Sequence, residues 1–309
     1  MVRKSFFVLI SFLFLFNSSS YAVENGFDIK NDPNAVSVNS SGGFLYSPRI
    51  ILTTAHNHLD EDSRTLLVGL PGEPWTPRAK KITAKKVFLA STYKDRTYLS
   101  GGNIFSRTDD FAVIVLDQPM VIRNKVKIAT KDQIEQFKAS HMNAKLVGYG
   151  LQSGEMRANT NDGRDVLEVA PKLIDSYVIT DGEVGKILQN SLPNGAIFNY
   201  DVNFAQTEKT GSICDNDSGS GWFVDQGDTR YYIGAASGGW GFPNCGKTGV
   251  WGNAGALASV SAAYKFLDLI SQAEAYIKSQ KVQCASGYKI KEFKLEKCPK
   301  GYKFIRFKD

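Results

Sequence analysis

Residues 211–221 read GSICDNDSGSG, and this stretch decides how the whole chain is interpreted. At its centre, Ser218 stands between Asp217 and Gly219 in a run of small residues suited to a tight turn. A serine acts as a nucleophile when a base lies beside its hydroxyl and a carboxylate orients that base, and these groups usually come from distant segments. Taken alone, the stretch is only a Gly/Ser turn, so the rest of the sequence must supply the other groups.

Two segments upstream supply a base and a carboxylate, in the order histidine, aspartate, serine. Residues 52–56, LTTAH, have the pattern of a buried strand that ends in small residues and His56. His58 is the competing histidine, but it lacks the preceding strand pattern. Residues 109–116, DDFAVIVL, place Asp110 at the start of a second apolar strand. Each segment alone would be read as structural, and only the three together indicate catalysis.

Together these segments resemble the histidine, aspartate and nucleophile motifs of the chymotrypsin-like serine peptidases, most specifically through Cys-x-x-Asp-Ser-Gly around Ser218. The resemblance implies a catalytic triad of His56, Asp110 and Ser218. It also implies an oxyanion hole made by the backbone N–H groups of Asn216 and Ser218. The expected activity is hydrolysis of protein or peptide substrates through an acyl-enzyme, with no cofactor and no metal ion.

The similarity covers about residues 23–273 and reaches two supporting features. Residues 233–237, IGAAS, resemble the strand whose last serine, here Ser237, supports the buried aspartate. A second alignment, which keeps Trp240-Gly241 in the usual register to Cys245, stays open. The resemblance also implies a disulfide between Cys214 and Cys245.

The specificity pocket that the resemblance implies is uncharged. Ser212 stands six residues before Ser218, at the position where trypsin-like members carry an acid. The expected pocket walls are Gly239 or Gly241, and Gly249. An uncharged, glycine-walled pocket favours a large apolar side chain of the substrate over Lys or Arg.

Three positions depart from the family pattern. Asn216 replaces the glycine that supplies an oxyanion donor, and asparagine accepts left-handed backbone geometry better than most residues. Ser41 and Asn57 stand where the family often has a disulfide beside the histidine. Because the oxyanion position and the pocket are altered, a catalytically weak or silent binding protein on the same fold is the alternative function.

Short apolar stretches broken by turn residues predict an all-β sandwich or barrel. With the resemblance, the expected fold is two six-stranded antiparallel β-barrels, over about residues 23–130 and 140–260. A C-terminal helix is expected over 261–280, where apolar residues recur at helical spacing. The irregular stretch 157–195 is expected to form surface loops.

Residues 1–22 have the composition of an export signal. Arg3 and Lys4 precede an apolar run over residues 6–16, and small residues lead to Ala22. The run is too short to span a bilayer comfortably. We therefore expect cleavage after Ala22 and a secreted or periplasmic location, with a buried N-terminal helix as the alternative.

Cleavage after Ala22 would create a new terminus, Val23 in VENG, that resembles the activating terminus of the family. In the family this ammonium group inserts into the barrel and pairs with the acid before the nucleophile, here Asp217. A buried carboxylate without a partner is strongly disfavoured, which gives the pairing a physical reason. A flexible start of the mature chain is the alternative.

Residues 281–309 lie outside the resemblance and hold the basic character of the chain. They contain nine Lys or Arg and three acids, a surplus equal to the net charge of +6 of the whole chain. Such a basic, aromatic-bearing extension can bind an anionic polymer or surface. Charge runs more often form a solvated face over strands packed on the main body, and the sequence favours that interpretation.

Four cysteines in an exported chain favour disulfides over metal ligation. Three connectivities are possible. Because Cys284 and Cys298 both lie in the basic extension, we pair them with each other, which agrees with the Cys214–Cys245 pairing. With three histidines and no close Cys/His cluster, a zinc site is not expected. The protein is expected to be a monomer.

Overall fold

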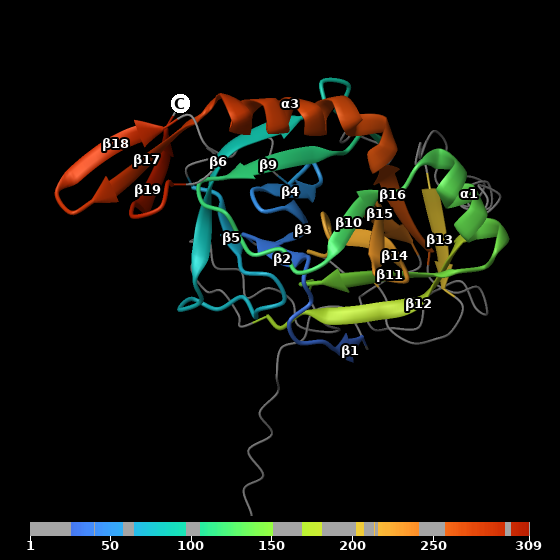
Figure 1. The fold of residues 1–309 in the computed structure, drawn as a ribbon. Coiled ribbons are helices and arrows are strands. Elements are labelled where there is room, and N and C mark those ends of the chain that lie inside the picture. Colours follow the sequence, from blue (N-terminus) through green and yellow to red (C-terminus); the bar gives the residue numbers. More distant parts are fainter. Residues whose placement is uncertain are drawn as a thin grey trace, which may run out of the picture.

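The computed structural model describes residues 26–39, 41–57, 65–96, 106–150, 169–180, 202–206, 213, 216–240, 257–293 and 298–308. Strands dominate this part of the chain. Figure 1 shows two groups of strands side by side, with helix α3 lying across one of them and a small separate sheet at the far left. Among the described residues, no helix has both the length and the apolar character needed to cross a bilayer.

The first barrel is a closed antiparallel ring in the order β2-β3-β4-β9-β6-β5. Its strands are β2 (Ala35–Val38), β3 (Ser41–Ser47), β4 (Ile50–Thr53), β5 (Leu67–Gly69), β6 (Lys81–Leu89) and β9 (Ala112–Leu116). Every residue of β9 is buried, because its alternate side chains serve two cores. Ile114 and Leu116 belong to the core of this barrel. Val113 and Val115 belong to the core shared with the second barrel and α3, so β9 is apolar throughout.

The second assembly is an eight-stranded sheet with the path β1-β12-β11-β14-β15-β16-β13, and β10 pairs with β15. Its strands are β1 (Phe27–Asp28), β10 (Lys125–Ile128), β11 (Asn143–Gly148), β12 (Lys172–Thr180), β13 (Val202–Gln206), β14 (Gly221–Gln226), β15 (Thr229–Trp240) and β16 (Leu257–Ala262). A further pairing of β12 with β13 closes six of these strands into a ring. The predicted all-β fold with two barrels is therefore confirmed. A two-stranded hairpin, β7 (Lys94–Arg96) and β8 (Ser106–Thr108), is separate from both.

Strand β12 lies inside the stretch expected to form surface loops, so that expectation is wrong for residues 172–180. Its buried side chains, Ile174, Tyr177 and Ile179, do not alternate strictly. The reason is a register shift between β11 and β12 at Ala144 and Leu146. A bulge of this kind places two residues opposite one and interrupts the period of two that identifies strands in a sequence.

Two helices differ from the sequence-based expectations. Helix α1 (Lys131–Ala139) was not predicted, although Thr130 and Gln133 form a capping box at its start. Helix α3 (Leu267–Ser279) is shorter than the stretch 261–280 that was expected to be helical. The 3₁₀ turn η1 (Ala263–Phe266) precedes it. Residues 261 and 262 are still in strand β16, where they pair with β15.

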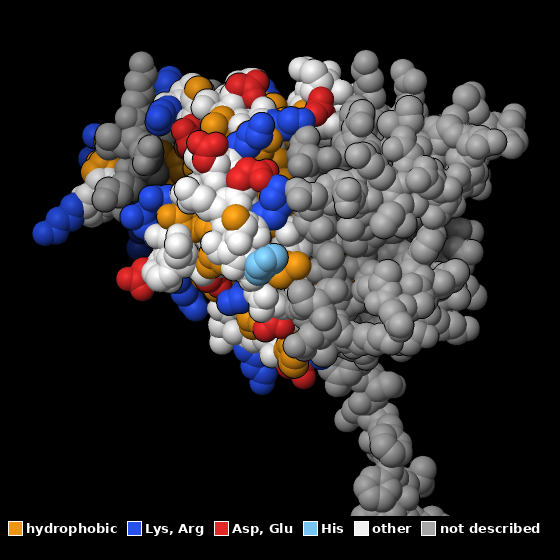
Figure 2. Space-filling model, turned by 90° about the vertical axis from the view of Figure 1, so that its right-hand side faces the viewer, with side chains coloured by type: hydrophobic (Ala, Val, Ile, Leu, Met, Phe, Trp, Pro, Cys, Tyr) orange, Lys and Arg blue, Asp and Glu red, His pale blue; other side chains and the backbone are white. Residues whose placement is uncertain are grey.

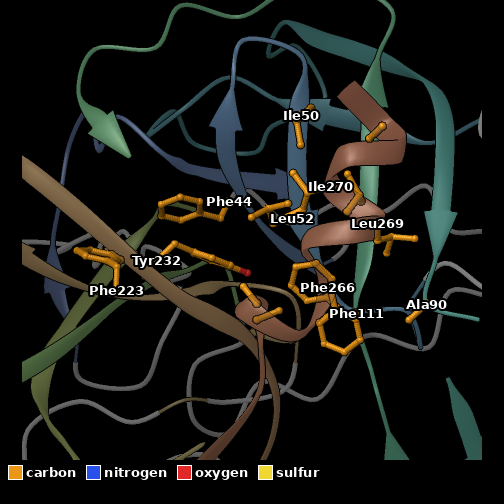
Figure 3. Packing of buried hydrophobic residues seen from close by; sticks show 14 of the residues in the cluster. Phe44, Ile50, Leu52, Ala90, Phe111, Phe223, Tyr232, Phe266, Leu269 and Ile270 are labelled. Atoms are coloured by element: carbon orange, nitrogen blue, oxygen red, sulfur yellow. The ribbon is translucent and has the colours of Figure 1, made fainter. Parts of the chain in front are cut away.

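One apolar core joins the two barrels and α3 (Figure 3). Phe44 of the first barrel lies 4.5 Å from Tyr232 of the second, measured between ring centroids. Phe111 stacks on Phe266 at 4.7 Å. A Cβ atom on Gly221 would lie 2.5 Å from the Phe44 ring, so a glycine is required where the barrels approach most closely.

A buried arginine also connects the barrels. Arg230 of β15 donates from Nη1 to both carboxylate oxygens of Asp32, just before β2, at 2.8 and 3.1 Å. Its Nε binds Asp225 at 2.9 Å, and its guanidinium lies 3.7 Å from the Phe223 ring centroid. Burial lowers the pKa of Arg230, but the charge of Asp32 and the contacts with Asp225 outweigh burial and raise it above its usual value.

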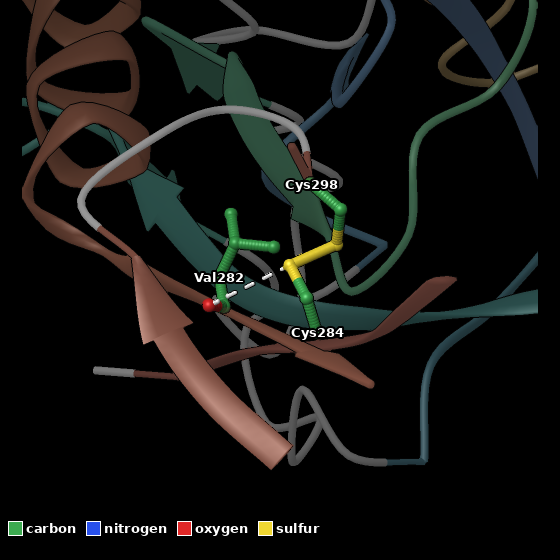
Figure 4. Close-up of a disulfide and its surroundings, with 3 residues drawn as sticks. All are labelled: Val282, Cys284 and Cys298. Carbon is green, nitrogen blue, oxygen red and sulfur yellow. Dashed lines mark hydrogen bonds between the residues drawn. A yellow bond between two sulfur atoms is a disulfide. The ribbon is translucent and has the colours of Figure 1, made fainter. Parts of the chain in front are cut away.

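The C-terminal extension forms its own three-stranded sheet in the order β18-β17-β19. Its strands are β17 (Lys281–Ser286), β18 (Lys289–Phe293) and β19 (Lys303–Lys308). The predicted disulfide between Cys284 and Cys298 is present (Figure 4). The other predicted bridge, Cys214–Cys245, lies outside the described residues, as does the signal segment 1–22.

The extension is joined to the first barrel through a second buried arginine. The guanidinium of Arg49 lies 3.4 Å from the ring centroid of Phe307 on β19. Arg49 also donates from Nη2 to Gln280 Oε1 at 2.7 Å, and from Nε to the carbonyl of Leu116 at 2.9 Å. A cation over an aromatic face is stabilising, more so where water is excluded.

Replacing the inter-barrel arginine tests its contribution to stability. We expect Arg230→Met to lower the free energy of unfolding by about 3 kcal/mol, because Asp32 stays buried after losing its cation. Urea unfolding of the purified protein measures this difference. Arg78→Met, at an exposed position, is the matched control and should change stability by less than about 0.5 kcal/mol. Equal stability of the two variants would contradict the assignment.

Candidate active site

The pairing of β4 with β9 places His56 beside Asp110. Thr53, near the end of β4, pairs with Ala112 at the start of β9, so the residue after one strand meets the residue before the other. His56 Nδ1 lies 2.7 Å from Asp110 Oδ2, and the His56 backbone N–H donates to Asp110 Oδ1 at 2.9 Å. Both carboxylate oxygens therefore fix the histidine in position and in ring orientation.

Asp110 is buried, with 1% of its surface exposed, and it receives a third hydrogen bond from the second barrel. The hydroxyl of Ser237 on β15 donates to Asp110 Oδ2. Burial raises the pKa of the Asp110 carboxyl, but hydrogen bonds and the charge of His56, together with Ser237, outweigh burial and lower it below its usual value. The carboxylate is therefore held in its ionised form.

A bulge in β15 directs Ser237 towards Asp110. The register between β15 and β16 shifts between Ala236 and Gly238. Bulges re-aim side chains in this way. Of the two alignments that the sequence left open, this geometry favours the one in which Ser237 supports the aspartate.

The nucleophile loop is held by hydrogen bonds from both barrels. The carbonyl of Ser218 accepts from the Gly42 N–H at 2.9 Å and from Asn57 Nδ2 at 3.3 Å. On the other side, the Gly219 N–H donates to the carbonyl of Ala236 at 2.8 Å. Ser218 is thus anchored to the residue that follows His56 and to the strand that carries Ser237.

The hydroxyl of Ser218 and the ring of His56 lie in the same site without a direct hydrogen bond among the described residues. Catalytic hydrogen bonds are often long or misaligned in unliganded proteins and tighten with substrate. The backbone N–H of Ser218 likewise has no acceptor in the described part of the chain. A donor that stabilises an oxyanion must be available in this way.

Two residues of the loop adopt left-handed backbone conformations. Asn216 has a φ of 73° and Gly219 a φ of 89°. Such conformations are rare for residues other than glycine, and asparagine is among those that tolerate them best. Asn216 therefore keeps the turn geometry that the family obtains with glycine.

Asp217, next to Ser218, is 1% exposed. Its Oδ1 accepts from the Gly150 N–H at 2.7 Å. A Cβ atom on Gly150 would lie 2.5 Å from Asp217 Cγ, so only glycine allows this approach. The sequence analysis missed Gly150, Gly42 and Asn57 as parts of the site, because their contacts are made with segments far away along the chain.

Hydrogen bonds replace the disulfide that is absent beside the histidine. Ser41 Oγ donates to the carbonyl of Val38 at 2.9 Å. Asn57 Nδ2 contacts Thr54 Oγ1 at 3.2 Å as well as the Ser218 carbonyl. Asn57 therefore links the histidine loop directly to the nucleophile loop.

Several predicted site residues lie outside the described residues. These are Val23, Ser212, Cys214, Gly241, Cys245 and Gly249. Gly239 is described and lies in β15, paired with Ala258 of β16. In the described part of the chain, no group of three or more His, Cys, Asp or Glu is arranged to hold a metal ion.

Comparison with known proteins gives one family. The family model described as Trypsin matches residues 27–267, which is most of the chain. No curated protein matches the sequence. The matched range includes His56, Asp110 and Ser218, and it ends within α3, before the basic extension.

A methyl group at Gly150 should disturb the nucleophile loop. We expect Gly150→Ala to slow the covalent modification of Ser218 by a fluorophosphonate by roughly 10²-fold, because displacing Asp217 also displaces its neighbour. Gly69→Ala is the control, since its nearest neighbour would lie at an ordinary 3.5 Å. Equal labelling rates in the two variants would show that the approach of Gly150 to Asp217 is unimportant.

Proposed function

Because the chain belongs to the trypsin family, we propose that it is an exported serine endopeptidase whose catalytic triad is Ser218, His56 and Asp110. The observation that carries this proposal is the buried His56–Asp110 pair, in which both carboxylate oxygens bind the histidine. The hydrogen bonds that anchor Ser218 beside this pair support it further.

The proposed reaction proceeds through an acyl-enzyme. His56 Nε2 takes the proton of the Ser218 hydroxyl while Oγ attacks the carbonyl carbon of the scissile bond. The charged imidazole is stabilised by Asp110, which stays ionised, and then passes the proton to the leaving amine. A water molecule, deprotonated by the same histidine, releases the acyl group and restores Ser218. The chemistry needs no metal ion or cofactor.

The backbone N–H groups of Asn216 and Ser218 form the proposed oxyanion hole. One such donor typically contributes about 3 kcal/mol of transition-state stabilisation. The available N–H of Ser218 and the left-handed backbone of Asn216 are the features that support this role.

Export and activation are proposed to be a single event. Signal cleavage after Ala22 leaves the ammonium group of Val23, which pairs with Asp217. The burial of Asp217 next to the nucleophile supports this pairing, because a buried carboxylate is stabilised by a nearby cation. The mature protein is then a monomer in a secreted or periplasmic location, active without a separate propeptide.

The proposed substrates are proteins or peptides with a large apolar residue before the scissile bond. Ser212, Gly239 and Gly249 supply the uncharged pocket on which this preference rests. A silent binding protein is the less favoured alternative. An ionised carboxylate removed from water has a desolvation cost, and binding alone gives no reason to hold it against a histidine.

Substitutions at the triad test the catalytic assignment. Ser218→Ala should abolish fluorophosphonate labelling and peptide hydrolysis. Asp110→Asn should reduce kcat on the order of 10⁴-fold, because the histidine is no longer held in the productive tautomer. Asp109→Asn is a matched control, since Asn also tolerates the left-handed backbone there. Hydrolysis that persists in Ser218→Ala would refute the mechanism, and a faster rate with Arg than with Phe before the scissile bond would refute the proposed specificity.

Extending the mature terminus tests activation. With one alanine inserted between Ala22 and Val23 and the new terminus verified by mass spectrometry, activity should fall by about 10²- to 10³-fold, the equivalent of losing a buried ion pair. Val23→Ile, which keeps the length and an apolar first residue, should retain activity. Full activity of the extended protein would instead support a flexible start of the mature chain.

A further inference from the structure

The extension is attached to the body at one end only. Val282 at the start of β17 pairs with Phe307, and Phe307 is the residue that contacts Arg49. The β17–β18 turn lies four residues beyond Val282, about 13 Å along the strand. Figure 1 shows this turn at the outermost point of the sheet, directed away from both barrels. We call the residues around it, 285–291 and 303–305, the distal end.

Apolar side chains gather at the distal end although the body does not cover them. Tyr288 is fully exposed, Ile290 is 64% exposed, and Phe304 and Ile305 are each more than a third exposed. The strand register brings them together, because Ile290 pairs with Ala285, which pairs with Lys303 on the other side. These four are the majority of the large apolar side chains that are exposed in the described part of the chain. Such clustering indicates an interaction site rather than scattered exposure.

Uncompensated lysines surround these apolar side chains. The one acid among the described residues of the extension, Glu292, is already bound by Lys308 at 2.7 Å and faces Lys281 at 3.8 Å. Among the described residues, Lys289, Lys291 and Lys303 have no acidic partner. On the face of the body seen in Figure 2, by contrast, acidic and basic side chains are interspersed. The distal end is therefore both apolar and strongly basic.

Simpler explanations account for only half of this arrangement. Lysines on edge strands prevent pairing with other sheets, but that role needs no exposed Tyr288 or Ile290. A second copy of the chain would bring like charges together, which is unfavourable. A soluble polyanion would neutralise the lysines but leave the apolar side chains in water. A lipid surface matches both features, because aromatic and aliphatic side chains enter the interfacial region while lysines contact acidic headgroups.

We propose that the distal end of the extension binds an anionic lipid bilayer. Tyr288 and Ile290 enter the headgroup region, and Lys289 and Lys291, adjacent to them on β18, contact the acidic headgroups. The lysine stems lie along the apolar layer while their charges stay in the headgroups. The barrels remain in water, and the bilayer concentrates the protein at its surface. This binding is independent of the proposed peptidase activity.

Vesicle co-sedimentation of the full mature protein tests the proposal. We expect binding to vesicles that contain phosphatidylglycerol, none to vesicles of phosphatidylcholine alone, and weaker binding as salt is raised. Lys289→Gln with Lys291→Gln should weaken binding by roughly 25-fold, since each lysine near an anionic surface contributes about fivefold. Tyr288→Ser with Ile290→Ser should weaken binding at least tenfold with the charge unchanged.

Matched substitutions on the body separate this site from general charge and hydrophobicity. Lys80→Gln with Lys125→Gln removes the same charge from exposed positions elsewhere. Val121→Ser removes an apolar side chain that is 72% exposed. Both controls should bind as the unmodified protein does. Circular dichroism confirms that each variant is folded, and hydrolysis of a small peptide reports separately on the active site.

Three results would overturn the proposal. The first is no binding to phosphatidylglycerol vesicles, which would make the extension a solvated face. The second is unchanged binding of the Tyr288→Ser, Ile290→Ser protein, which would assign the lysines to a soluble polyanion; retention on a heparin column would then identify that class. The third is an equal loss of binding in the body controls, which would mean that net charge alone acts.

Discussion

The buried carboxylate of Asp110 is the constraint on which the rest of the site depends. An ionised group that is 1% exposed must be satisfied by nearby donors, and here the donors come from His56 and from Ser237 on the second barrel. The carboxylate therefore has all of its partners only when the two barrels are docked. Folding of the chain and assembly of the catalytic pair are in this sense one event.

The same seam between the barrels also holds the nucleophile loop. Gly42 donates to the Ser218 carbonyl, and its own carbonyl accepts from Thr53 Oγ1 at 2.9 Å. A side chain at Gly42 is impossible, since its Cβ would lie 2.0 Å from Ser220 Oγ. Core packing by Phe44 and Tyr232 surrounds these polar contacts. Because packing and the site share this seam, a change that loosens the barrels also misaligns the chemistry.

The C-terminal extension follows a different logic from the barrels. It has a small core of its own, formed by Val282, Cys284 and Phe307 and closed by a disulfide, and it meets the body mainly through Arg49. A layer this thin cannot bury every apolar side chain that it carries. The surplus stays exposed at the end farthest from the barrels, together with most of the excess positive charge. Catalysis and surface contact are thus assigned to parts of the chain that share few interactions.

The sequence by itself determined the order of the His56, Asp110 and Ser218 motifs, the two-barrel class and the Cys284–Cys298 disulfide, because each leaves a local pattern of residue types. It indicated less about strand β12, the bulge at Ser237 and the approach of Gly150 to Asp217. The capping box of α1 was readable from Thr130 and Gln133 but lay in a polar connector. Only the tertiary structure decided these features, because register shifts and backbone approaches arise where distant segments pair, and neither partner carries the pattern alone.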